Sequence, residues 1–174
     1  NMGTGSQIIL KSNTINFKSF EKRNYFNNEL NCKTHIPSGR SLNLIADKIN
    51  KIYHKQNYFW IKLKKIKLKN LTQCNKNIDL DYFKLKKVLN TKEIKKNINN
   101  FVIIVLKSYC DQYVSCINKL TIKKFNPKNL VLSGGIPKRV PIIKSYLQYK
   151  TGINTKFYNS RVDETLIGLL KLSK

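Results

Sequence analysis

The segment Asn129–Arg139, NLVLSGGIPKR, constrains the fold of this chain more than any other. The apolar run Leu130–Leu132 is typical of a buried strand, it stops at Ser133-Gly134-Gly135, and a helical pattern begins at Pro137. Two consecutive glycines allow positive φ and let a flat or charged ligand lie against the backbone. The free N–H groups of the following helix favour an anion at the same place. The segment predicts a strand, a glycine turn and a helix that suit a phosphate or nucleotide, with a purely packing role for the glycines as the alternative.

A long helix precedes this segment, and further elements follow it. Asn90 is a candidate N-cap with Glu93 in the first turn, and apolar residues then recur at helical spacing from Ile94 to Leu120. Such a helix must be mostly buried. The features expected after the glycines are a helix with Val140, Ile143 and Leu147 inward, a cap at Gly152, an extended stretch Asn154–Tyr158 and a last helix Ser160–Leu172.

The chain begins with a glycine-rich turn that leads into extended segments. In Gly3-Thr4-Gly5, backbone N–H groups and a hydroxyl are able to hold a phosphate oxygen, although the isolated motif is no more than a turn. Alternating apolar residues over 8–17 predict a hairpin, and residues 25–36 are extended in character. Pro37–Arg40 is expected to form a turn, and the apolar spacing of 41–55 predicts an amphipathic helix.

The middle of the chain gives a weaker pattern. Residues 56–71 mix two periods and are assigned to a helix, and residues 71–83 are assigned to a loop with short extended pieces. Asp79 and Asp81 have a spacing that could serve acid–base chemistry. Because lysines surround both carboxylates, we favour surface ion pairing instead.

The formal net charge of +25 raises the possibility of nucleic-acid binding, because lysines neutralise phosphates. However, only four of the 34 basic residues are Arg, and the chain has 22 Asn and a single Ala, a composition typical of an AT-rich genome. A dedicated binder would use more Arg. We therefore favour solvated lysines over a binding patch, and we assign the aromatic residues Tyr58, Phe59 and Trp60 to core packing rather than to base stacking.

The cysteine and histidine positions indicate no metal site. The four cysteines form no C-x-x-C pair, and the two histidines do not complete a metal spacing. This pattern indicates free thiols and a reducing, cytoplasmic compartment. No apolar run approaches the roughly 20 residues needed to cross a bilayer, so no membrane partner is expected.

The order of these motifs resembles the C-terminal end of the sugar kinases of the FGGY carbohydrate kinase family. The likeness rests on LVLSGG, a helix, TG, a strand and DETLIGLL, with NMGTGSQI and HIPSGR upstream. That family belongs to the ATPase superfamily that includes actin and the heat-shock chaperones. The resemblance implies an α/β fold, namely a ribonuclease H-like, actin-like ATPase domain with a mixed sheet flanked by helices. Residues 1–174 would be one domain, the nucleotide-binding C-terminal half, with the N-terminal half absent.

The resemblance also implies roles for individual residues. Double glycines lie beside the adenosine of ATP in the family, and the GTG loop contacts phosphate. The residues so assigned to ATP are Gly3, Thr4, Gly5, Gly134 and Gly135; those assigned to the sugar are His35, Ser38 and Arg40, for which a turn and a helix cap are the alternative. Lys138 departs from the family, which commonly has a smaller polar residue there; it is assigned to ATP because its charge is able to reach a phosphate, and a solvent-facing side chain is the alternative. No catalytic or metal-binding residue is assigned, because the family's catalytic aspartate and first phosphate loop lie upstream of the GTG loop.

The complete enzyme is expected to transfer a phosphoryl group from ATP, with Mg²⁺, to a hydroxyl of a ketose or pentulose sugar. This chain alone is expected to be inactive and to need an N-terminal kinase half, in cis or in trans. Two other classes stay open. One is a pseudoenzyme or split-gene subunit, and the other is a basic nucleic-acid-binding module. The sequence does not name the sugar or the oligomeric state.

Overall fold

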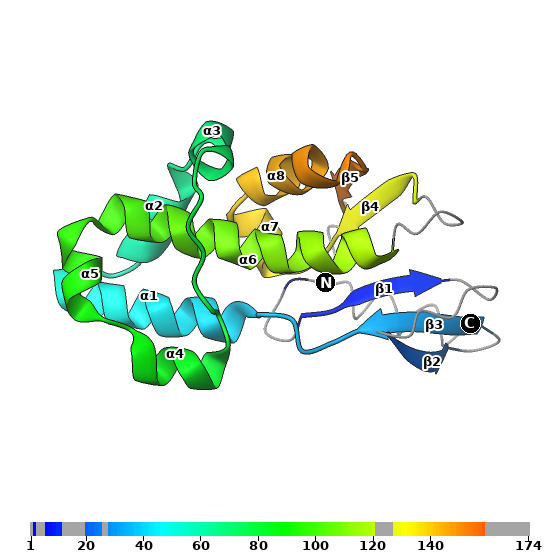
Figure 1. Cartoon of the computed structure of the whole chain (residues 1–174), viewed down its shortest axis with the longest axis horizontal. Coiled ribbons are helices and arrows are strands. Elements are labelled where there is room, and N and C mark those ends of the chain that lie inside the picture. The colour runs from blue at the N-terminus through cyan, green and yellow to red at the C-terminus, as the bar shows by residue number, and fades with distance from the viewer. Residues whose placement is uncertain (1, 3–5, 12–19, 26–27, 121–126, 159–174) are drawn as a thin grey trace.

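The strands form two small sheets (Figure 1). The computed structural model describes residues 2, 6–11, 20–25, 28–120 and 127–158. One sheet is antiparallel with the order β1-β3-β2, and the other is a parallel pair. The strands are β1 (Ile8–Lys11), β2 (Glu21–Tyr25), β3 (Asn28–Lys33), β4 (Asn129–Leu132) and β5 (Asn154–Phe157).

Helices make up most of the rest of the described chain. They are α1 (Gly39–Tyr53), α2 (Tyr58–Lys64), α3 (Leu68–Thr72), α4 (Tyr82–Val88), α5 (Thr91–Lys96), α6 (Ile98–Leu120), α7 (Gly135–Arg139) and α8 (Ile142–Thr151). The predicted mixed α/β class is therefore confirmed. The predicted single mixed sheet is not seen among the described residues, where the strands are divided between two sheets.

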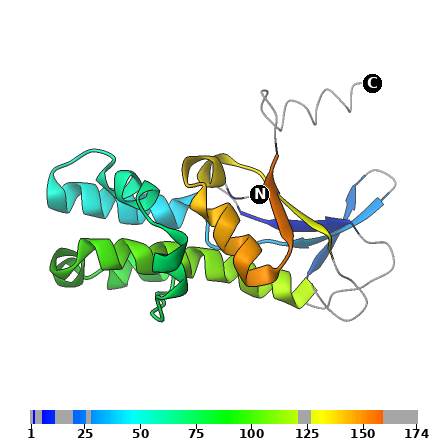
Figure 2. The ribbon, with the colours of Figure 1, turned by 90° about the horizontal axis from the view of Figure 1, so that it is seen from above.

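Helix α6 is the element on which the other parts pack (Figures 1 and 2). It contacts α2, α3 and α5 along its first half, and β1 and α8 further along. Val105, Leu106 and Tyr109 are fully buried. The predicted buried helix is thus confirmed, and it joins the helical end of the molecule to both sheets in one hydrophobic core.

The long helix predicted from Asn90 is divided in two. Asn90 does cap α5, since its side chain accepts a hydrogen bond from the Lys92 N–H at 2.9 Å. The break falls at Asn97, whose backbone leaves the helical region and whose side chain accepts the Asn100 N–H at 2.9 Å. Asparagine competes with the helix for backbone N–H groups, and here it ends one helix and starts the next.

The segment between α1 and α5 follows the prediction in outline. The helix expected over 56–71 is two short helices, α2 and α3, and a loop follows from Gln73. No strand lies in that loop, all of which the structure describes. Asp79 pairs with Lys84 at 2.9 Å, and Asp81 caps α4. The ion pairing that we favoured over acid–base chemistry is therefore confirmed for Asp79, whereas Asp81 accepts backbone N–H groups at the start of a helix instead.

The N-terminal strands were only partly expected. β3 lies inside the extended region predicted over 25–36, and β1 is the first arm of the predicted hairpin. The second arm, within 12–19, lies outside the described residues. β1 pairs with β3, with Ile8 opposite Lys33 and Leu10 opposite Asn31. β2, with sequence EKRNY, was not predicted and lies at the edge of the sheet.

The strand, glycine turn and helix predicted around Gly134 are confirmed, with one correction. The single helix expected from Pro137 is two helices, because Val140 leaves the helical region and Pro141 restarts the chain as α8. Val140, Ile143 and Leu147 are buried and Gly152 caps α8 at φ 69°, as predicted. The extended stretch after Gly152 is β5, and the helix predicted over 160–172 lies outside the described residues.

Candidate functional site

The backbone of Met2 joins the start of the chain to the glycine turn. Its N–H donates to the Ser133 carbonyl at 3.0 Å, and its own carbonyl accepts the Ile136 N–H at 3.3 Å. The Met2 side chain is buried. Ser133 and Ile136 flank Gly134-Gly135, and Met2 directly precedes Gly3. The residue that directly precedes Gly3 is therefore hydrogen-bonded on both sides of the distant Gly134-Gly135 turn.

The two glycines of the turn have different physical requirements. Gly134 has φ 94° and ψ 168°, a conformation that is essentially restricted to glycine. Gly135 begins α7, is exposed, and has no heavy atom within 4 Å of the place where a Cβ would lie. The fold thus explains the glycine at 134. At Gly135 it leaves open space, which suits a ligand lying against the backbone.

The break at Val140 and Pro141 shortens the helix that follows the glycine turn. Helix α7 has five residues, so it provides little of the helix dipole that was expected to attract a phosphate. What remains at the turn is its exposed backbone and the charge of Lys138, which is exposed on α7. Any affinity for a phosphate must therefore come from local N–H groups and side chains.

Arg139, next to Lys138, is used to hold two helices together. Its guanidinium lies 4.0 Å from the centre of the Trp60 ring, and one nitrogen donates to the Asn57 side chain at 3.1 Å. Trp60 and Phe59 are buried, which confirms their assignment to the core. Arg139 therefore ties α7 to α2, and neither of these two rings presents a face for stacking on a base.

The predicted phosphate loop is located only through its neighbours. Gly3, Thr4 and Gly5 lie outside the described residues. Met2 and Ser6, on either side, form an antiparallel bridge, and both are buried. Met2 thus lies at the glycine turn, and Ser6 lies just before β1.

The three residues predicted to lie near a sugar meet at one cavity. It has a volume of about 460 Å³ and is lined by Ser6, Gln7, Thr34, His35, Ile36, Ser38 and Arg40. Ser38 also caps α1 by accepting the Arg40 N–H at 3.3 Å, as the structural alternative proposed. His35 is exposed and has a left-handed backbone with φ 57°. The cavity is polar and large enough for a small polar ligand.

Two tyrosines that the sequence did not single out hold this loop on α6. The Tyr113 hydroxyl donates to the Pro37 carbonyl at 3.0 Å, and the Tyr109 and Tyr113 hydroxyls lie 3.2 Å apart. Burial raises the pKa of Tyr113 to about 12 and that of Tyr109 further. Both hydroxyls stay neutral at physiological pH. Their positions within the helical pattern are ordinary core positions, so no sequence signal marked them.

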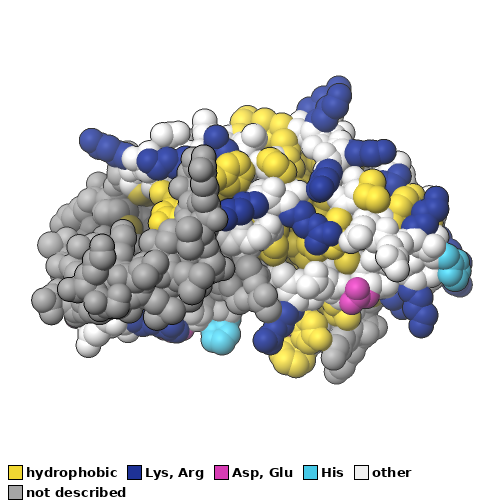
Figure 3. Space-filling model, turned by 180° about the vertical axis from the view of Figure 1, so that it is seen from behind, with side chains coloured by type: hydrophobic (Ala, Val, Ile, Leu, Met, Phe, Trp, Pro, Cys, Tyr) yellow, Lys and Arg dark blue, Asp and Glu magenta, His cyan; other side chains and the backbone are white. Residues whose placement is uncertain are grey.

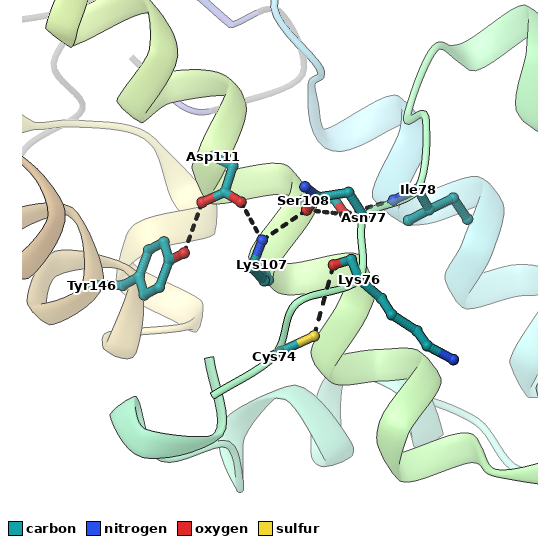
Figure 4. A network of polar contacts seen from close by, with 8 residues as sticks. All are labelled: Cys74, Lys76, Asn77, Ile78, Lys107, Ser108, Asp111 and Tyr146. Atoms are coloured by element: carbon teal, nitrogen blue, oxygen red, sulfur yellow. Dashed lines mark hydrogen bonds and ion pairs between the residues drawn. The ribbon is translucent and has the colours of Figure 1, made fainter. Parts of the chain in front are cut away.

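A second polar network lies away from this cavity, between α6, α8 and the loop before α4 (Figure 4). The Lys107 ammonium contacts Asp111 at 2.6 Å and Asn77 at 2.9 Å, and Tyr146 donates to the other Asp111 oxygen at 2.7 Å. Burial and the hydrogen bond to Asp111 raise the pKa of Tyr146. The polar groups of this network are hydrogen-bonded to one another. The network therefore joins three segments of the fold rather than presenting groups to a ligand. Its sequence signal was a Lys and an Asp four apart in an apolar helix.

Basic side chains of the described residues are spread over the face that Figure 3 shows. Figure 3 shows the Lys and Arg side chains of one face scattered among apolar and uncharged groups. Within the described ranges, no group of three or more His, Cys, Asp or Glu side chains is arranged to hold a metal ion, and no helix is long and apolar enough to span a membrane. Cys32, Cys74, Cys110 and Cys116 are all free thiols.

Comparison with known proteins adds no assignment. The chain matches no protein-family model, and comparison with curated proteins and with solved structures gave no significant match. The functional argument therefore rests on the residues and their geometry.

Proposed function

We propose that this chain is the nucleotide-binding, C-terminal half of an FGGY-type carbohydrate kinase, with a ribonuclease H-like fold. The observation that carries the proposal is the position of Met2, which is hydrogen-bonded on both sides of the glycine turn and directly precedes Gly3. Two motifs that bind the same ligand must lie close together in the fold. The separation of these two motifs in the sequence does not by itself bring them together. Their being joined favours a common ligand over two unrelated turns.

The order of the segments along the chain also matches the order of the groups in phosphoryl transfer. One end of the Gly3-Thr4-Gly5 segment is Met2, at the turn assigned to adenosine, and the other is Ser6, in the wall of the cavity assigned to the sugar. The segment assigned to phosphate thus lies in the chain between the two sites. A kinase has to place the transferred phosphoryl group between nucleotide and acceptor.

In this proposal the chain binds and positions but does not catalyse. Gly134 and Gly135 contact adenosine, Lys138 and the backbone of Gly3-Thr4-Gly5 contact phosphate, and the cavity around His35, Ser38 and Arg40 holds the sugar. ATP would supply the phosphoryl group, with Mg²⁺ held by acids of the N-terminal half. That half would also supply the catalytic base, and the cytoplasm is the expected compartment.

The test is calorimetric titration with Mg²⁺–ATP at moderate salt, which screens the bulk lysine charge. Three proteins are compared: the parent chain, Gly135→Arg and Ser145→Arg. Both variants add the same charge at an exposed position, but only the first fills the open space at the turn. We expect Gly135→Arg to abolish binding and Ser145→Arg to retain it. Equal binding by all three would assign the signal to the lysines and would contradict the proposed site.

A further inference from the structure

A cavity of about 330 Å³ opens at the helical end of the molecule, between α2, α3 and the first turns of α6 (Figure 1). Both short helices pack on α6 beside it. Its polar lining comes from all three helices and the end of α2, and consists of Lys62, Lys65, Asn70 and Asn99. The cavity shares no residue with the sites proposed for ATP and for the sugar.

Lys62 is already held in position at this cavity. Its ammonium donates to the Asn99 side-chain oxygen at 2.8 Å and lies 5.2 Å from the centre of the Tyr58 ring. An ammonium has three N–H donors, so the bond to Asn99 leaves others for a ligand. Lys65 lies three residues further along, at the end of α2, and is exposed. A side chain that is positioned before binding loses less rotamer freedom when the ligand arrives.

The two asparagines offer donors to the cavity rather than acceptors. The Asn70 oxygen accepts the Lys67 N–H at 2.9 Å, and the Asn99 oxygen accepts the Lys62 ammonium. Because both of these partners are donors, each bond fixes which side-chain atom is the oxygen. The NH2 group of each asparagine, with two donors, remains for a ligand. Among the described residues that line the cavity, none is acidic. Its polar wall therefore suits an anion.

The surroundings of the cavity also favour negative charge. Residues 48–78, which supply α2 and α3, contain no Asp or Glu. Asn99 is the second residue of α6, a helix of 23 residues whose first turn, all of it described, carries no acidic side chain. The positive end of a helix dipole stabilises an anion near the first turn. The cavity thus combines two ammonium groups with a helix end that no acidic side chain of that turn neutralises.

We propose that this cavity binds a small phosphate monoester. Such an ester carries about 1.5 to 2 negative charges at pH 7, which matches two lysines better than the single charge of a carboxylate. Its three terminal oxygens accept from ammonium and amide groups. Ile66, Val102 and Ile103 line the rest of the cavity and provide an apolar surface for the organic part of the ester. The volume lies near the lower end of the range for ligand pockets, about 300–1,000 Å³, so the ester is small.

The test is an NMR titration of the full chain with phenyl phosphate, at moderate salt to screen the bulk lysine charge. The side-chain NH2 signals of Asn70 and Asn99 report binding at the cavity. Phenyl sulfate has the same ring but a single charge, and inorganic phosphate lacks the ring. We expect phenyl phosphate to shift both signals and to bind about fivefold tighter or more than either other probe. Unshifted signals would overturn the site. Equal binding of phenyl sulfate or of inorganic phosphate would overturn the choice of a phosphate monoester.

Two pairs of variants, all at exposed positions, separate the cavity from the bulk charge. Lys65→Gln removes a cavity lysine, and Lys64→Gln removes a neighbouring lysine that is not among the described residues lining the cavity. Asn99→Asp gives Lys62 a carboxylate partner, whereas Asn100→Asp adds the same charge one residue further along. We expect the two cavity variants to weaken phenyl phosphate binding about fivefold or more, and the two controls to weaken it less than about twofold. Equal binding within either pair would overturn the proposed site.

The outcome is independent of the proposed function. Gly135→Arg, which is expected to abolish ATP binding at the glycine turn, changes no residue of this cavity and should leave the phenyl phosphate titration unchanged. A chain that binds phenyl phosphate at the cavity but shows no ATP binding at the turn would contradict only the kinase proposal. The reverse result would contradict only this one.

Discussion

The turn between β4 and α7 gives the sharpest test of the structure, because two adjacent glycines should respond oppositely to the same substitution. Gly134→Ala forces a Cβ onto a backbone with φ 94° and ψ 168°, which costs about 1–3 kcal/mol. Gly135→Ala places a methyl group in open space at the start of a helix, where the lower entropy of the unfolded chain stabilises by about 0.4–1 kcal/mol. The two proteins have identical composition and should differ by roughly 1.5–4 kcal/mol.

The assay is urea denaturation followed by far-ultraviolet circular dichroism. With a slope of about 1–3 kcal/mol per molar urea, the two midpoints should be separated by roughly 1 M, with the parent between them. Equal slopes in the three proteins are the control, since they show that the unfolded states are comparable. If Gly135→Ala is destabilised as much as Gly134→Ala, the open space at Gly135 and its helical backbone are both wrong. The assignment of that space to a ligand would then lose its basis.

Three further outcomes follow from other contacts. Asp111→Ala should lower the free energy of unfolding by about 3 kcal/mol in thermal unfolding, because it leaves the Lys107 ammonium buried with Asn77 as its remaining partner in this network. Tyr146→Phe removes one hydrogen bond to Asp111 and should cost only about 1 kcal/mol. Equal losses in the two variants would contradict the network. Arg139→Ala should alter the fluorescence of Trp60, the only tryptophan, because it removes the guanidinium that lies over the ring. Lys138→Ala is the control and should leave the spectrum unchanged. An unchanged spectrum in both variants would exclude the stacking of Arg139 on Trp60. The hydrogen bond from Lys84 lowers the pKa of Asp79, so this pair stabilises above the unfolded pKa of about 4 and its contribution is lost as pH falls through the lower folded pKa. Lys84→Met should raise the Asp79 pKa in an NMR titration, and an unchanged value would refute the pairing.

The local pattern of the sequence was sufficient to predict several elements. Ser38 and Asn90 were recognisable as helix starts because a side-chain oxygen that bonds the next backbone N–H groups acts within one turn. β4 and the turn at Gly134 were predictable for the same reason, since an apolar run and a glycine that needs positive φ are local signals.

The predictions of helix and strand boundaries failed where a local sequence signal was weaker than a competing one. The helix periods run through Asn97 and Val140, and the apolar pattern alone gives no sign that a side chain or a proline ends the helix there. β2 has no apolar alternation because it is an edge strand, held by the pairing of Lys22 with Glu29 and by its backbone. Such a strand is recognised only once its partner is known.

Several residues of the candidate site could be predicted from the sequence, but the contacts that bring them together could not. His35, Ser38 and Arg40 were identified from a turn motif, and they line one cavity. Tyr113, which supports that loop from α6, was indistinguishable from any other core residue, because a long-range hydrogen bond to Pro37 leaves no mark on the local sequence. The bond from Met2 to Ser133 is likewise invisible until the chain is folded.

Met2 is hydrogen-bonded on both sides of the glycine turn, and this has a physical consequence for the proposed function. Among the described residues, the hydrogen bonds of Met2 to Ser133 and Ile136 and its bridge to Ser6 connect the start of the chain with the glycine turn. When the backbone of a site is already ordered before the ligand binds, the binding free energy of the ligand is not reduced by the cost of ordering that backbone. In the proposed function, the hydrogen bonds of Met2 would therefore order the glycine turn for a ligand through the backbone, without any contact between Met2 and the ligand.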